Sequence, residues 1–107
     1  MEFNQFKDEL KKANLEAVRT DEADYFEAVF VKAELAPLTI IIEKIFGVPV
    51  FPSSSKIPAE AVKAAEKFGG VRGGQTLYFS KKDSNLFFCM FWPWQDRQHI
   101  TLKTGRA

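Results

Sequence analysis

The sequence predicts an α+β fold, with an antiparallel sheet of about five strands and helices packed mainly on one face. Three observations support this prediction. The 107 residues fit a single domain spanning 1–107, and 46% of them are hydrophobic and 27% charged, as in globular proteins. Apolar residues recur at helical spacing in some segments, and aromatic and β-branched residues fill strand-like runs in others. The expected order of elements is α-β-β-α-α-β-β-β, without an internal repeat.

The first part of the chain predicts a helix followed by a hairpin. The helix is expected over 2–14, where apolar residues recur on one side: Phe3, Phe6, Leu10 and Ala13. Residues 15–20 and 25–32 are expected to form two strands, since the second run is rich in aromatic and β-branched residues. The acidic stretch Asp21–Asp24 between them is interpreted as a solvated turn.

The middle of the chain predicts two more helices. Pro37 suits the first turn of a helix over 37–46, and Gly47 suits its left-handed C-cap. The helix should bury a stripe formed by Leu38, Ile41, Ile42, Ile45 and Phe46. Residues 48–56 are expected to be a loop, because two prolines and three serines disfavour regular structure. Pro58 then opens a helix that reaches Phe68 and ends at two glycines.

The last part of the chain predicts three consecutive antiparallel strands, at 75–80, 86–92 and 98–103, with a frayed tail over 104–107. The strand 86–92 does not alternate apolar and polar residues. Phe87, Cys89 and Phe91 point one way, and the residues between them, which point the other way, are equally apolar. Either the chain covers both faces of this strand, or one face presents an aromatic patch to a partner.

Composition excludes several kinds of site and compartment. One cysteine and one histidine rule out an internal disulfide and any site within the chain that needs two imidazoles or several thiolates, so no metal and no cofactor is expected. The N-terminal residues do not resemble a secretory signal, and no uncharged stretch approaches the roughly 20 residues that span a bilayer. We therefore expect a cytoplasmic protein that does not enter membranes.

Two short motifs could carry chemistry. Arg72 and Gly73 lie in a Gly-Gly-Val-Arg-Gly-Gly stretch that could bind an anion, although phosphate loops run from a strand into a helix and this one runs the other way. A helix C-cap followed by a tight turn explains the same glycines. Cys89 and His99 could meet across adjacent strands as a nucleophile and a base, but Cys89 stands in an apolar strand without basic neighbours.

The leading functional prediction is a non-enzymatic interaction or regulatory module that uses an aromatic sheet face to bind a partner protein or to form a homodimer. The residues expected to bind are Arg72, Gly73, Tyr78, Phe87, Phe91 and Trp94. One alternative is a single-stranded nucleic-acid-binding protein whose phosphate contacts are Lys81, Lys82, Arg97 and Lys103. The net charge of +1 counts against it. A further alternative is an enzyme that acts on a small anionic substrate near Arg72.

Overall fold

The structure of the protein is a computed structural model that describes residues 3–47, 49–51, 63, 66, 75–82 and 85–106, with only the backbone of Lys81, Lys82 and Asn85. Its elements are α1 (Phe3–Lys11), β1 (Ala17–Asp21), β2 (Tyr25–Val31), a 3-10 turn (Lys32–Glu34), α2 (Leu35–Phe46), β3 (Thr76–Lys82), β4 (Asn85–Pro93) and β5 (His99–Arg106). The predicted helix at 58–68 lies outside the described residues, apart from Lys63 and Glu66, which are helical.

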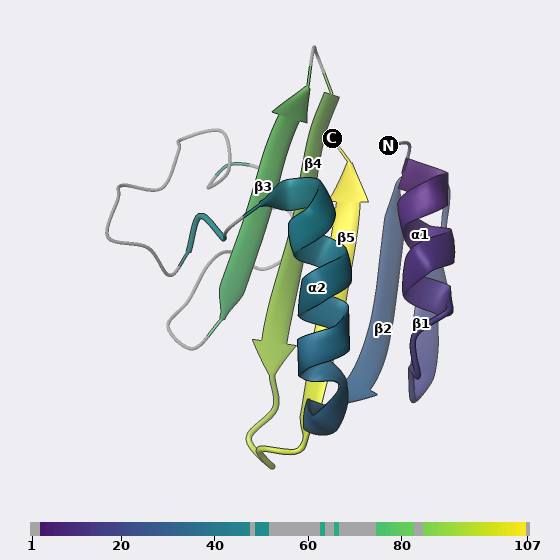
Figure 1. The fold of residues 1–107 in the computed structure, drawn as a ribbon, viewed down its shortest axis with the longest axis vertical. Helices are drawn as coiled ribbons and strands as arrows, with labels where there is room; N and C mark the ends of the chain where they lie inside the picture. The colour runs from purple at the N-terminus through teal and green to yellow at the C-terminus, as the bar shows by residue number, and fades with distance from the viewer. Residues whose placement is uncertain are drawn as a thin grey trace.

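The five strands form one antiparallel sheet in the order β1-β2-β5-β4-β3. Both helices lie on the same face of the sheet, with α1 in front of β1 and β2 and α2 in front of β4 and β5 (Figure 1). The α+β prediction is therefore confirmed, as is the antiparallel pairing of the last three strands. β5 comes last in the chain but lies at the centre of the sheet.

The end of the chain is ordered, so the prediction of a frayed tail over 104–107 is wrong for its described part. β5 continues to Arg106, and Thr104 is buried with its hydroxyl donating a hydrogen bond of 2.7 Å to the Phe88 carbonyl oxygen. Gly105 allows this close packing. A Cβ at this position would lie 2.9 Å from both the Asp24 carbonyl oxygen and a Phe88 ring carbon.

The acidic turn between β1 and β2 is exposed to solvent, as predicted, and it also forms ion pairs with other elements. Two lysines of α1 bind the Asp21 carboxylate, with Lys7 Nζ 3.0 Å from Oδ1 and Lys11 Nζ 2.5 Å from Oδ2. The bond to Lys11, followed by that to Lys7, lowers the pKa of Asp21. Asp24 pairs with Arg106 at the end of β5. The turn thus connects α1 and β5 to the hairpin.

The helix α2 starts two residues before the predicted boundary and ends at Phe46, as predicted. Gly47 follows with φ of 74° and ψ of −152°, a region open essentially only to glycine, and its N–H donates to the Glu43 carbonyl oxygen. Leu38 and Ile42 are buried, but the neighbouring isoleucines of the stripe are only half-buried. The buried stripe is therefore narrower than predicted, because α2 packs on a sheet that it covers only in part.

Both faces of β4 belong to the core. On the helix side, Cys89 and Phe91 are buried among residues of both helices and of β2 and β5. On the other side, Phe88 and Met90 are buried and form a second cluster with Leu77, against which Val50 and Phe51 pack. The doubled apolar pattern of this strand is thus explained by burial within the chain. No helix among the described residues is long and apolar enough to cross a membrane.

Candidate functional site

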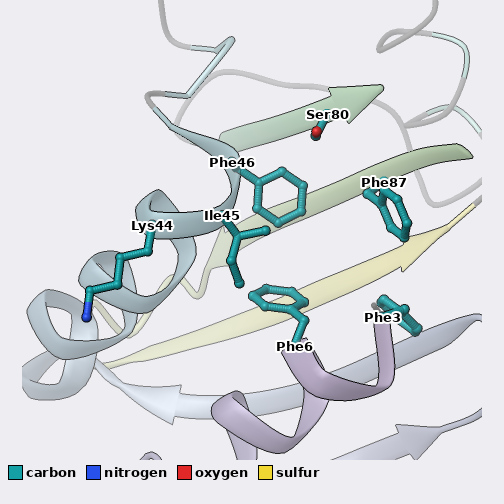
Figure 2. Close-up of a pocket in the computed structure, with 7 residues that line it drawn as sticks. All are labelled: Phe3, Phe6, Lys44, Ile45, Phe46, Ser80 and Phe87. Atoms are coloured by element: carbon teal, nitrogen blue, oxygen red, sulfur yellow. The ribbon is translucent and has the colours of Figure 1, made fainter. Parts of the chain in front are cut away.

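The described part of the chain contains a hollow between α1 and α2, above the sheet, with a volume of about 230 Å³. Four phenylalanines make up most of its wall, and Figure 2 shows their rings gathered around it. The complete lining consists of Phe3, Phe6, Lys44, Ile45, Phe46, Ser80 and Phe87. The hollow is therefore an aromatic site that takes its residues from both helices and two strands.

Helical spacing brings the rings together. Phe3 and Phe6 are three residues apart and so project from the same side of α1. Phe46 ends α2, and its ring meets the Phe6 ring edge-on with a centroid distance of 5.5 Å. Phe87 projects from β4, and Figure 2 shows it beside Phe46 and near Phe3. This aromatic pair joins the two helices, and the hollow lies beside it.

Few polar side chains line this site, but polar atoms still make up a large part of its exposed surface. Figure 2 shows the Lys44 side chain extending from α2 away from the four rings. Ser80, from β3, is the other polar residue of the lining. Such a surface can pack against an apolar or aromatic group and also presents polar atoms at its edge.

The residues predicted to bind are placed in three different surroundings. Phe87 lines the hollow. Tyr78 and Phe91 lie on the same face of the sheet but are buried, with their rings 6.0 Å apart in a T-shaped contact. The Tyr78 hydroxyl donates to Glu43 of α2 at 2.8 Å, and burial raises the pKa of this phenol. These two residues belong to the core and do not line the hollow.

Trp94 lies apart from this group. It stands in the turn between β4 and β5, is half-exposed, and donates from Nε1 to Thr101 Oγ1 at 2.8 Å. Thr101 pairs with Val29 and Trp92 on the face of the sheet opposite the helices. The structure therefore does not bring Trp94 together with Phe87. Arg72 and Gly73 lie outside the described residues.

The structure does not support a catalytic pair of Cys89 and His99. Cys89 is fully buried on the helix side, where burial strongly raises the pKa of its thiol, whereas His99 is on the other face of the sheet. Within the described residues, no group of three or more His, Cys, Asp or Glu side chains could hold a metal ion.

Comparisons with family models, curated proteins and solved structures give no match to this chain. The site must therefore be interpreted from its own geometry. The sequence predicts Phe3, Phe6 and Ile45 as core residues, and Phe3 and Phe6 are indeed buried, but all three also line the hollow. No sequence pattern indicates the site, because Ile45 and Phe46 occupy the i+7 and i+8 positions of the predicted stripe and look like ordinary core residues.

Proposed function

We propose that this protein is a non-enzymatic interaction module that binds one large apolar side chain of a partner protein in the hollow between α1 and α2. The observation that carries the proposal is the aromatic lining of this hollow, with Phe3, Phe6, Phe46 and Phe87 around a volume of about 230 Å³. A cytoplasmic location is part of the proposal, since the single cysteine is a buried free thiol of the kind that reducing compartments maintain.

The size of the hollow favours a side chain over a larger ligand. Pockets for drug-sized molecules occupy about 300–1,000 Å³, whereas an apolar cavity of about 150 Å³ already accepts benzene. Full burial of one large apolar side chain contributes about 1.5–3 kcal/mol. Association costs about 4–15 kcal/mol, so the partner must also make contacts around the hollow. We therefore expect weak binding of an isolated side chain and tighter binding of an intact partner.

The proposal can be tested with short peptides that present a single Trp, Phe or Leu among Gly and Ser residues. In NMR titrations at millimolar concentration, we expect the ring resonances of Phe3, Phe6, Phe46 and Phe87 to shift. A peptide with Ala at the central position should not shift them, since it has too little apolar surface to fill the hollow.

Ser80 offers a matched pair of variants. Ser80→Phe places a ring in the hollow and should abolish the shifts, whereas Ser80→Ala removes only the hydroxyl and should preserve them. Shifts that persist in Ser80→Phe would place the binding elsewhere and overturn the proposal. If the chain instead associates with itself, and Ser80→Phe prevents this association, the occupant is a second copy, as in the homodimer alternative.

Single-stranded nucleic-acid binding is retained as a second candidate because of one observation on the other face of the sheet. Trp94 is half-exposed there, with the Arg19 guanidinium 5.4 Å from its ring centre, a pairing that can stack a base and contact a phosphate. A short single-stranded oligonucleotide should then bind with an affinity that falls steeply with salt, and more weakly after neutralisation of Lys81 and Lys82. Absence of binding at low salt would remove this candidate.

A further inference from the structure

The single histidine of the chain lies between two carboxylates from different parts of the fold. His99, the first residue of β5, has Nδ1 2.5 Å from Asp96 Oδ2 and Nε2 2.8 Å from Glu16 Oε2. Asp96 belongs to the turn between β4 and β5, and Glu16 directly precedes β1. The imidazole thus connects the turn with the beginning of the edge strand.

This geometry requires a charged imidazole. Ionised carboxylates only accept hydrogen bonds, and a neutral imidazole has one N–H donor and one lone pair. Only the imidazolium can donate to both carboxylates, while the neutral ring would place a lone pair against an oxygen. The hydrogen bond to Asp96, followed by the negative charge of Glu16, raises the pKa of His99 above its ordinary value of 6.5.

The two carboxylates are held differently. Asp96 also accepts backbone N–H bonds from Gln98 and His99, at 2.9 and 3.0 Å, which together with the imidazole lower its pKa to about 2. Glu16 is tied to the neighbouring strand by its backbone, whose N–H donates to the Val29 carbonyl oxygen at 2.8 Å. Loss of the imidazole contact would therefore leave Asp96 in its turn and release only the Glu16 side chain.

The Trp94 ring reports on this arrangement. Its centre is 4.8 Å from that of the His99 ring, at an interplanar angle of 31°. The charged groups around the pair are Glu16, Asp96, Arg19 over the Trp94 ring, and Glu27, which lies 3.9 Å from Arg19. Arg97 belongs to the same turn. Positive and negative side chains thus surround the stacked Trp94 and His99 rings. Among these groups, histidine is the residue type whose charge changes near neutral pH.

We propose that His99 is a protonation-dependent clamp that fastens the turn between β4 and β5 to the segment before β1. On deprotonation, Nε2 gives its proton to water and its contact with Glu16 is lost, while Nδ1–H continues to donate to Asp96. The Glu16 side chain is then released, while the turn keeps its backbone hydrogen bonds from Trp94 N–H to the His99 carbonyl oxygen and from Lys32 N–H to the Gln98 carbonyl oxygen.

NMR of the imidazole nitrogens tests this clamp directly, because the chain has only one histidine. As the pH rises, we expect a midpoint above 6.5 and a neutral form that carries its proton on Nδ1. Trp94 fluorescence should increase with the same midpoint, since a stacked imidazolium quenches an indole, and Trp94→Phe should abolish the increase. A midpoint at or below 6.5, or a neutral form protonated on Nε2, would overturn the proposal.

Two matched variants separate the clamp from general charge effects. Glu16→Gln removes the second carboxylate and should lower the His99 midpoint, and amide shifts around residue 16 should no longer follow the titration. Glu22→Gln removes the same charge from the exposed turn at the other end of the hairpin and should leave the midpoint unchanged. Equal effects of the two variants would show that Glu16 has no specific contact and would contradict the proposal.

Discussion

At the scale of single residues, close contacts between atoms determine which substitutions the protein tolerates. Gly105 lies between the Asp24 carbonyl oxygen and the Phe88 ring, where an added Cβ would come within 2.9 Å of each. The sequence predicts a frayed tail over 104–107, which includes this glycine. The reason for this glycine is the ring of a residue on the adjacent strand, and a contact of this kind has no local sequence pattern.

We therefore expect Gly105→Ala to destabilise the protein by about 1–3 kcal/mol, the usual range for an overpacked site. Urea unfolding measures this difference. Arg106→Ala, on the neighbouring residue, removes only an exposed ion pair and should cost less than about 1 kcal/mol. If Gly105→Ala were as mild as Arg106→Ala, Phe88 and the turn would have to move aside at little cost.

At the scale of elements, the sequence predicts the type of each described helix and strand because periodicity reflects burial. The sequence is less informative about how helices and strands pack together, because this depends on contacts between residues far apart in the chain. The hollow depends on how α1 and α2 pack on the sheet, and this involves contacts of this kind, such as that between the Phe6 and Phe46 rings. Phe3 therefore belongs to the core, as the sequence predicts, and also lines the hollow.

Within α2, two isoleucines that are two positions apart differ in burial. Ile42 is completely buried, whereas Ile40 is 59% exposed. Ile42→Ala should lower the free energy of unfolding by about 2–5 kcal/mol, and Ile40→Ala by less than about 0.5 kcal/mol. Urea unfolding of the two variants checks the orientation of the helix. Equal losses would mean that α2 is rotated on the sheet.

The attachment of α1 should depend on pH through Asp21. Hydrogen bonds from Lys11 and Lys7 lower its pKa from 3.8, so its stabilising contribution is present above this value and disappears as the pH falls through the lowered pKa. Asp21→Asn should therefore be less stable than the parent protein at neutral pH and equally stable in strong acid. Urea unfolding across this range measures the difference. Asp8→Asn, an exposed change on α1, should lack this pattern, and a similar profile for both would exclude a specific role of Asp21.

At the scale of the whole molecule, the two apolar faces of β4 decide whether the chain must associate. From the sequence alone, the pattern allowed either a core on both sides or a face for a partner. In the structure, residues on both faces of the strand are buried within the chain, so no uncovered face of β4 demands a second copy. Light scattering over a concentration series should therefore give the monomer mass of 12.2 kDa throughout.

The variant Phe91→Lys tests whether Phe91 lies in the core of one chain or at an interface between two copies. Phe91 is only 4% exposed and packs edge-on against Phe30 and Tyr78, so a lysine there would bury an unpaired ammonium. The variant should lose its cooperative unfolding transition in circular dichroism. Val18→Lys adds the same charge on the edge strand β1, where the side chain is 50% exposed, and should remain folded. A folded, monomeric Phe91→Lys derived from a dimeric parent would instead place Phe91 at an interface between copies.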